Sequence, residues 1–324
     1  MDKKSRGETG RAHDVSLKVC TKCLLNENYP GLTFSPEGVC SQCANARPPR
    51  MLKIDLLLKE LEKAKRKRVS YDALVPLSGG MDSSYVLYLA RRVYDLKVLA
   101  YTFDNGFLAP TARKNIQALT ESLGADLVLF TPPWDLMKRL YRSTLLFAGD
   151  MCGVCAIGIA RNTAAMARAY RIPLILRGST PMELNSGSPE DLQDTARLRA
   201  IVRDSGEVTE EELDLFLAHL PARTMLHYAL PRLGLKAKGI CPFHYGERKS
   251  EEEIRNILLS ETGWRDESDS GRVKHFDCVA EPFTNYVREH RHGYSRRGIQ
   301  YSNLIRFGEM SLQDARRKIE QEAP

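Results

Sequence analysis

A short apolar run that ends in a hydroxyl group and two glycines constrains this chain more than any other feature of its sequence. The run reads Tyr71-Asp-Ala-Leu-Val-Pro-Leu-Ser78-Gly79-Gly80-Met81-Asp82-Ser83-Ser84-Tyr85. Its first half predicts a buried strand, and the residues after the glycines predict an amphipathic helix. Glycines let the backbone approach an anion closely, and the amides of the next helical turn point at that anion. The segment therefore predicts a phosphate-binding loop.

This loop lacks the lysine that follows the glycines in loops specialised for γ-phosphate transfer. We expect its backbone and hydroxyl groups to bind phosphate and Asp82 to hold Mg²⁺ as a catalytic group. The predicted phosphate-binding residues are Ser78, Gly79, Gly80, Asp82, Ser83 and Ser84.

Short apolar runs alternate with amphipathic segments on both sides of this loop. Strands are expected over 73–77, 97–103, 127–130 and 174–176, and helices over 52–65, 83–93, 111–123, 135–147 and 157–170. This alternation is typical of an α/β fold with a doubly wound parallel sheet, whose ligands bind beyond the carboxyl ends of the strands. Later helices are expected over 207–220, 251–259 and 312–320.

Four of the eight cysteines lie near the start of the chain as two CxxC pairs, with sixteen residues between the pairs. Each pair turns tightly enough to present both sulfurs to one ion, so four thiolates can surround Zn²⁺ tetrahedrally. We predict a structural zinc site, with an iron-sulfur cluster as the less favoured alternative. The ligands would be Cys20, Cys23, Cys40 and Cys43.

A second set of cysteines lies within and after the α/β region. The pair Cys152 and Cys155 precedes a predicted helix and is compatible with a redox dithiol, half of a metal site or two buried residues. With Cys241 it offers three thiolates, which would leave one iron of a 4Fe-4S cluster open to sulfide or substrate. For His275 and Cys278 the sequence favours packing over chemistry.

The loop resembles the SGGxDS signature of the PP-loop ATP pyrophosphatases, which cleave ATP between its α and β phosphates to adenylate a substrate. This resemblance implies an adenine nucleotide hydrolase-like fold that uses ATP and Mg²⁺. It also implies that Phe103 and Asp104 lie near the nucleoside, and that Gly178 and Ser179 lie near ATP.

Two branches of this superfamily share further motifs with the chain. The cysteine set resembles that of cluster-dependent tRNA thiolases, which implies that Cys152, Cys155 and Cys241 hold the cluster and take part in catalysis. Both ends of the chain and its loop are similar to N-acetyl sugar amidotransferases, in the cysteine pairs and in Gly293-Tyr-Ser with Ile305-Arg-Phe-Gly-Glu-Met-Ser311. That branch implies ammonia from a glutaminase partner.

Composition sets the remaining expectations. The 324 residues are 43% hydrophobic, with no apolar run near the ~20 residues that span a bilayer, so we expect a globular cytoplasmic protein. The net charge of +7 suits RNA, although the basic run over 63–68 also fits a solvated helix end. The expected divisions are a disordered tail (1–16), a zinc-knuckle module (17–50), an ATP-binding domain (51–190) and a C-terminal helical extension (191–324) that contributes Cys241.

The sequence thus predicts ATP-dependent adenylation of an acceptor oxygen followed by sulfur transfer through a 4Fe-4S cluster. The first alternative is sugar amidotransfer, and an alternative of another class is a zinc-knuckle binding module with a vestigial nucleotide loop. The expected partners are the acceptor (tRNA, a sugar or another small molecule), a sulfur donor or glutaminase subunit, and a second copy in a homodimer.

Overall fold

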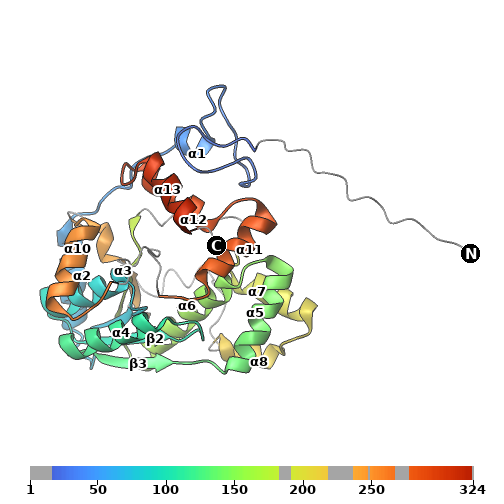
Figure 1. The fold of residues 1–324 in the computed structure, drawn as a ribbon. Helices are drawn as coiled ribbons and strands as arrows, with labels where there is room; N and C mark the ends of the chain where they lie inside the picture. Colours follow the sequence, from blue (N-terminus) through green and yellow to red (C-terminus); the bar gives the residue numbers. More distant parts are fainter. Residues whose placement is uncertain (1–16, 182–190, 218–235, 247–248, 267–276, 323–324) are drawn as a thin grey trace, which may run out of the picture.

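The computed structural model describes residues 17–181, 191–217, 236–246, 249–266 and 277–322, and a five-stranded parallel sheet lies at its centre (Figure 1). The strand order is β3-β2-β1-β4-β5, and every neighbouring pair is parallel. The strands are β1 (Ala73–Pro76), β2 (Val98–Phe103), β3 (Asp126–Phe130), β4 (Leu174–Leu176) and β5 (Lys238–Ile240).

Alternate residues of the strands face opposite sides of the sheet, as the pleat requires. Leu74 and Leu99 join one buried cluster, while their neighbours Ala73 and Val98 join another. Helices supply the rest of both clusters, so the sheet is covered on both faces and the predicted doubly wound α/β fold is confirmed. The first face carries α5 (Trp134–Ala148), α6 (Cys152–Ala169), α7 (Thr195–Ser205) and α8 (Glu210–Phe216); the second carries α2 (Ile54–Lys65), α3 (Met81–Tyr88), α4 (Pro110–Leu123) and α10 (Glu251–Glu261).

Some elements differ from the sequence expectation. The helix after the loop changes to a π-helical turn, η1 (Leu89–Val93), and α6 begins at Cys152 rather than at residue 157. Strand β5 was not expected, since it is only three residues long and carries a glycine. A short 3-10 turn, η3 (Pro242–His244), follows it.

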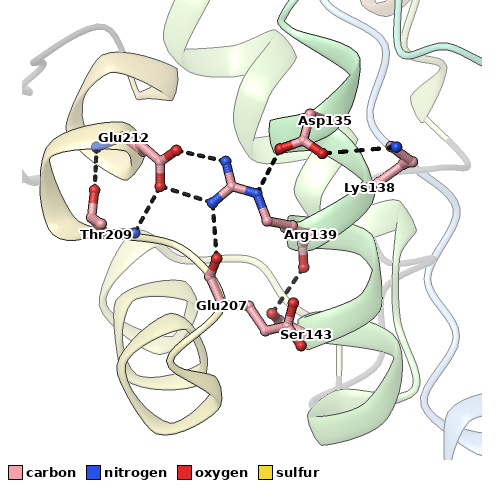
Figure 2. Close-up of polar contacts among 7 residues, drawn as sticks. All are labelled: Asp135, Lys138, Arg139, Ser143, Glu207, Thr209 and Glu212. Atoms are coloured by element: carbon pink, nitrogen blue, oxygen red, sulfur yellow. Dashed lines mark hydrogen bonds and ion pairs between the residues drawn. The ribbon is translucent and has the colours of Figure 1, made fainter.

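An ion-pair network fixes the α7–α8 hairpin against α5 (Figure 2). The guanidinium of Arg139 donates to Asp135 on its own helix and makes two hydrogen bonds, of 2.6 and 2.9 Å, to the carboxylate of Glu212. It also donates to the carbonyl oxygen of Glu207. Thr209 and Glu212 form a capping box that begins α8. Arg139 therefore joins three segments on one side of the sheet.

The two ends of the described chain pack together around the N-terminal cysteines. The end of the chain forms α11 (Glu281–His292), α12 (Arg296–Arg306) and α13 (Leu312–Glu322), and the short helix α1 (Ser41–Ala44) lies beside them (Figure 1). Tyr294 and Ile299 join a buried cluster with the cysteines, and the Tyr29 and Tyr294 rings meet edge to face. The Leu24 amide donates to the Ser302 hydroxyl, which ties the cysteine segment to α12.

Several expectations are not tested by this architecture. The tail over 1–16, most of the loop over 185–191, and His275 lie outside the described residues, and the domain boundaries stay predictions. Strand β5, which lies beyond the expected boundary at residue 190, pairs with β4 and so belongs to the same sheet as the strands of the expected ATP-binding domain. Within the described residues, no helix combines the length and the apolar character that crossing a bilayer would demand.

Candidate nucleotide site and cysteine groups

The predicted phosphate loop leaves β1 at the carboxyl edge of the sheet and enters α3 directly. Gly79 has a φ of +82°, and a Cβ there would lie 2.5 Å from the Ala112 carbonyl oxygen, so both backbone conformation and space require glycine. Gly80 is the N-cap of α3, and no side chain caps this helix. The first amides of a helix lack partners within it, so the start of α3 presents donors and a positive dipole end to the loop.

Buried side chains from distant parts of the chain support the loop from behind. The Gly79 carbonyl oxygen accepts hydrogen bonds from the Trp264 indole at 2.9 Å and from the Asn115 amide at 3.2 Å. The Asn115 side chain also makes two hydrogen bonds with the backbone of Arg265, so α4 is bonded directly to the segment that carries Trp264. Sequence reasoning missed both residues, because only the fold brings positions 115 and 264 behind the loop.

The loop hydroxyls organise the turn itself. The Ser83 hydroxyl lies 3.1 Å from the Ser78 amide and 3.1 Å from the Ser78 hydroxyl. Ser84 is buried and donates to the Gly80 carbonyl oxygen at 2.7 Å, so its hydroxyl closes the turn. Ser78 and Ser83 thus stand at the mouth of the loop, while Ser84 supports it.

A cavity of about 360 Å³ opens beside the loop, within the size range of small-ligand sites. Five of the predicted binding residues line it, and Arg177 adds a positive charge that the sequence analysis did not assign. Gly178 passes so close to α3 that an added Cβ would lie 2.8 Å from the Ser83 amide nitrogen. The predicted residues that line the cavity are Ser78, Asp82, Ser83, Gly178 and Ser179, joined by Thr163 and Ala156 of α6.

Phe103 and Asp104, expected near the nucleoside, do not line this cavity. The Phe103 ring is buried and packs against Phe130 and Phe216 in the core. Asp104 is buried as well, and one of its carboxylate oxygens accepts a 2.6 Å hydrogen bond from Arg113. Its other oxygen accepts from the Gly106 amide, so Asp104 shapes the turn after β2.

A larger cavity of about 770 Å³ also lies against α6. Ala156 and Ala160 line both cavities, so the two spaces adjoin at this helix. The walls of the larger one combine apolar residues such as Ile157 and Leu192 with charged and amide side chains, among them Arg161, Arg296, Asp191, Asp194, Gln193 and Gln300. The site therefore offers a second compartment next to the one beside the loop.

The four N-terminal cysteines form a compact group. Their sulfurs all lie within 4.8 Å of one another, with 3.9 Å between Cys20 and Cys43 and 3.8 Å between Cys23 and Cys40. Tetrahedral ligands with zinc-sulfur bonds of ~2.3 Å stand ~3.8 Å apart, which matches these separations. The hydrogen bond with Cys43 lowers the pKa of Cys23 to about 5, whereas burial raises the pKa of Cys40 to about 11 and the hydrogen bond with Cys23 raises the pKa of Cys43, so one thiol of the four gives up its proton readily. The arrangement can hold a single metal ion.

The second pair of cysteines occupies the first turn of α6, at the carboxyl edge of the sheet. Cys155 lies 3.2 Å from the Tyr141 hydroxyl and accepts a hydrogen bond from the Asn105 amide at 3.6 Å. Burial, with smaller contributions from the neighbouring Cys152 and Cys278, raises the pKa of Cys155 to about 12, although the hydrogen bonds with Tyr141 and Asn105 oppose the rise. Burial also raises the pKa of Cys152, whose thiol donates to Thr284 of α11.

Cys241, the predicted third ligand, follows β5 at the edge of the sheet. Among the described residues, only the N-terminal four form a cysteine group with all sulfurs within 4.8 Å, so this set is not preformed for one small ion. An iron-sulfur cluster holds its thiolates farther apart than a single ion does, so this distance criterion does not test a cluster site. The assignment of Cys152, Cys155 and Cys241 as cluster ligands stays a prediction.

Asp277 and Cys278 also reach the site, although the sequence analysis assigned them no role in it. A Cβ on Gly80 would lie 3.5 Å from the Asp277 carboxylate, which places this acid over the phosphate loop. Cys278 receives a 3.7 Å hydrogen bond from Asn105. The signal in the sequence was weak, because nothing near position 277 shows that it pairs with the chain after β2.

No protein-family model and no curated protein matches the sequence. Among solved structures, the chain is similar to the U34-tRNA thiolase NcsA from Methanococcus maripaludis with its 4Fe-4S cluster, at 15% identity and a TM-score of 0.38, over 94% of this chain and 88% of that one. It is also similar to the NH₃-dependent NAD synthetase from Campylobacter jejuni, at 14% identity and a TM-score of 0.35, over 66% of this chain and 87% of that one. A third similar structure is the NMN synthetase from Francisella tularensis, at 12% identity and a TM-score of 0.33, over 74% of this chain and 94% of that one.

The similarities are remote. The sheet order and the geometry of the loop support the proposals below.

Proposed function

We propose that this protein is an ATP pyrophosphatase that adenylates an acceptor oxygen. One observation carries the proposal: the Ser78–Ser84 loop joins the carboxyl end of a central parallel strand to an uncapped helix and opens on a cavity that Arg177 also lines. Loop amides, a helix N-terminus and a guanidinium are the groups that bind a polyphosphate. Asp82 lines the same cavity and is the proposed Mg²⁺ ligand.

In the proposed first step, the acceptor oxygen attacks the α-phosphorus of ATP. The bond from that phosphorus to the bridging oxygen breaks, and pyrophosphate leaves with the electron pair. The acceptor oxygen becomes the oxygen of an adenylate and hence a good leaving group. This chain contributes mainly position and charge, from the loop amides, Asp82 with its metal, and Arg177.

We propose that the acceptor occupies the larger cavity. It adjoins the nucleotide cavity at Ala156 and Ala160, and walls that mix apolar surface with polar side chains suit a hydroxylated or carbonyl-bearing substrate. Arg161 and Arg296 line this cavity together with Asp191 and Asp194, and Arg296 pairs with Asp191, so the walls offer charged groups of both signs to a polar acceptor. The class of acceptor, tRNA or a small molecule such as a sugar, is an outcome of the experiment below.

For the second step we propose sulfur transfer. Cys152 and Cys155 open α6 directly before Ala156, which lines both cavities. A bound 4Fe-4S cluster with one open iron would present sulfide to the adenylate. Hydrosulfide then attacks the carbon that bears the adenylated oxygen, the C–O bond breaks, and AMP leaves with that oxygen and the electron pair, with no change of oxidation state.

One observation favours the second candidate, amidotransfer to a sugar. The two ends of the chain that resemble the sugar amidotransferases pack against each other, through Tyr294, Ile299 and the N-terminal cysteines. The Arg306 guanidinium also lies 3.8 Å from the Cys23 sulfur. In this candidate ammonia replaces the adenylated oxygen, and no cluster is needed.

The N-terminal cysteines have the same proposed role in both candidates. We propose that they bind Zn²⁺ with no open position, because four thiolates complete a tetrahedron. They lie in a cluster with α12 residues, so the ion would stabilise the fold of this end of the molecule.

The test is pyrophosphate release from ATP in the presence of either bulk tRNA or nucleotide sugars, with mass spectrometry of the acceptor. The proposal predicts release with one acceptor class, with a product that carries sulfur. A product that carries nitrogen would replace sulfur transfer by amidotransfer. Absence of release with every acceptor would favour a binding module with a vestigial loop.

A further inference from the structure

Cys278 lies in the same group as Cys152 and Cys155, although it is more than a hundred residues away in sequence. Asn105 shows this most directly. Its side-chain amide donates one hydrogen bond to the Cys155 sulfur at 3.6 Å and another to the Cys278 sulfur at 3.7 Å. An amide nitrogen carries two hydrogens, so one side chain can serve both sulfurs at once.

The orientation of the Asn105 side chain is fixed by its own backbone environment. Its carbonyl oxygen accepts a hydrogen bond from the Phe107 amide at 2.9 Å, which leaves the amide nitrogen facing the two sulfurs. The Tyr141 hydroxyl donates to the Asn105 backbone carbonyl at 2.8 Å and also lies beside Cys155. The hydrogen bonds from the Asn105 amide lower the pKa of both thiols, against the burial that raises it, and so favour the thiolate form that a metal cluster requires.

Main-chain pairing holds Cys278 in this place. Leu108 and Cys278 form an antiparallel bridge, in which the Ala109 amide donates to the Asp277 carbonyl and the Val279 amide donates to the Phe107 carbonyl. The bridge ties Cys278 to the same loop that carries Asn105. Cys278 therefore belongs to the sheet edge at β2.

Cys241 belongs to the opposite side of the sheet. Asn105 follows β2, whereas Cys241 follows β5, and β5 stands three places from β2 in the strand order. Neighbouring strands lie ~4.8 Å apart, so three places amount to ~14 Å across the sheet. Cys155, which contacts Asn105, lies on the β2 side with Cys278.

We infer that Cys278, together with Cys152 and Cys155, forms the three-thiolate ligand set of the site, and that Cys241 is not a ligand of that group. This inference rests on the sulfur-transfer branch of the proposed function. Three cysteine ligands are enough for a 4Fe-4S cluster with one open iron. The partly apolar surroundings fit such a group, since Cys155 and Cys278 both pack against the core of the first sheet face.

The test is anaerobic reconstitution with iron and sulfide, measured as iron, acid-labile sulfide and zinc per chain. Cys278→Ala should lower bound iron at least about tenfold, as Cys152→Ala does, while Cys241→Ala keeps the wild-type value. Zinc should stay constant in all variants, because it reports the separate N-terminal group. Iron lost in Cys241→Ala and retained in Cys278→Ala would overturn the assignment.

A measurement on the unmutated chain guards against variants that fail to fold. Alkylation with iodoacetamide before and after reconstitution, read by mass spectrometry, should show that cluster loading protects Cys152, Cys155 and Cys278 but not Cys241. Iron binding without protection of Cys278 contradicts only this inference. A wild-type chain that binds no iron contradicts both the inference and the sulfur branch, while pyrophosphate release tests the adenylation step independently.

Discussion

The two cysteine regions of this molecule use the same residue type in opposite ways. Three of the N-terminal four are almost entirely buried and Cys43 is partly buried, with the sulfurs already at the separations that one tetrahedral ion requires. Cys152 and Cys155 open a helix beside two cavities, with the Asn105 amide directed at the Cys155 sulfur. A closed set of ligands serves stability, whereas an open set at the edge of a parallel sheet can serve chemistry.

The largest expected effect concerns the N-terminal cysteine group, whose closed set of ligands is proposed to serve stability. Cys40→Ser should release zinc and lower the unfolding temperature by roughly 10 °C or more, because metal binding supplies several kcal/mol of folding free energy. Cys155→Ser should leave zinc and the unfolding temperature nearly unchanged. Thermal unfolding with metal analysis of both variants measures this difference, and an equal loss in the two would remove the distinction.

The next effect concerns chemistry at the open side. Asp82→Asn should lower the rate of pyrophosphate release by about 100-fold or more, through loss of metal and charge stabilisation at the α-phosphate. Its unfolding temperature should match the wild type. Steady-state release kinetics check this, with Asp126→Asn at the far end of the sheet as the matched control. A rate within twofold of wild type would exclude Asp82 from catalysis.

A smaller effect is expected behind the loop. Trp264→Phe keeps most of the buried ring but removes the hydrogen bond to the Gly79 carbonyl, which is worth about 1 kcal/mol. The KM for ATP should rise several-fold with little change in kcat, because the loop is less firmly placed. An unchanged KM in the folded variant would show that the indole does not position the loop.

The smallest effect lies far from both cysteine groups. The hydrogen bonds from Arg139 lower the pKa of Glu212 to about 2 (Figure 2). A carboxyl whose folded pKa is depressed adds stability above its unfolded pKa of about 4.3, and loses it as the pH falls towards 2. The unfolding temperature of the wild type should therefore fall more steeply between pH 5 and pH 2 than that of Glu212→Gln.

Glu211→Gln is the matched control for this pH dependence, since Glu211 lies on the same turn but outside the network of Figure 2. It should follow the wild-type curve. Parallel curves for the wild type and Glu212→Gln would contradict a contribution of the Arg139 ion pair to the docking of α8.

Local patterns predicted the parts of this molecule that depend on neighbours in sequence. Sequence spacing was enough to predict the β1 and β2 strands, the loop glycines and the N-terminal cysteine group, because in each of them that spacing fixes the local geometry. The Trp264 support of the loop was not, since only the fold brings its indole to Gly79. The bridge that carries Cys278 to Leu108 was hidden for the same reason.

Phe103 shows that a correctly predicted strand does not fix the direction of a side chain. Its place at the end of β2 is correct, but the alternation of the strand directs the ring into the core, against Phe130 and Phe216. A residue at the end of a strand can therefore face the core, and sequence position alone does not decide which way it faces. The expected place of Phe103 near the nucleoside stays a prediction.

Calorimetric titration with an ATP analogue that resists cleavage between the α and β phosphates tests the central claim most directly. With Mg²⁺, the wild type should bind one analogue per chain. Gly79→Ala should weaken binding by about 100-fold, because a Cβ would displace the loop from Ala112. Absence of binding to the wild type, or equal affinity in the folded Gly79→Ala variant, would contradict a nucleotide site in this loop.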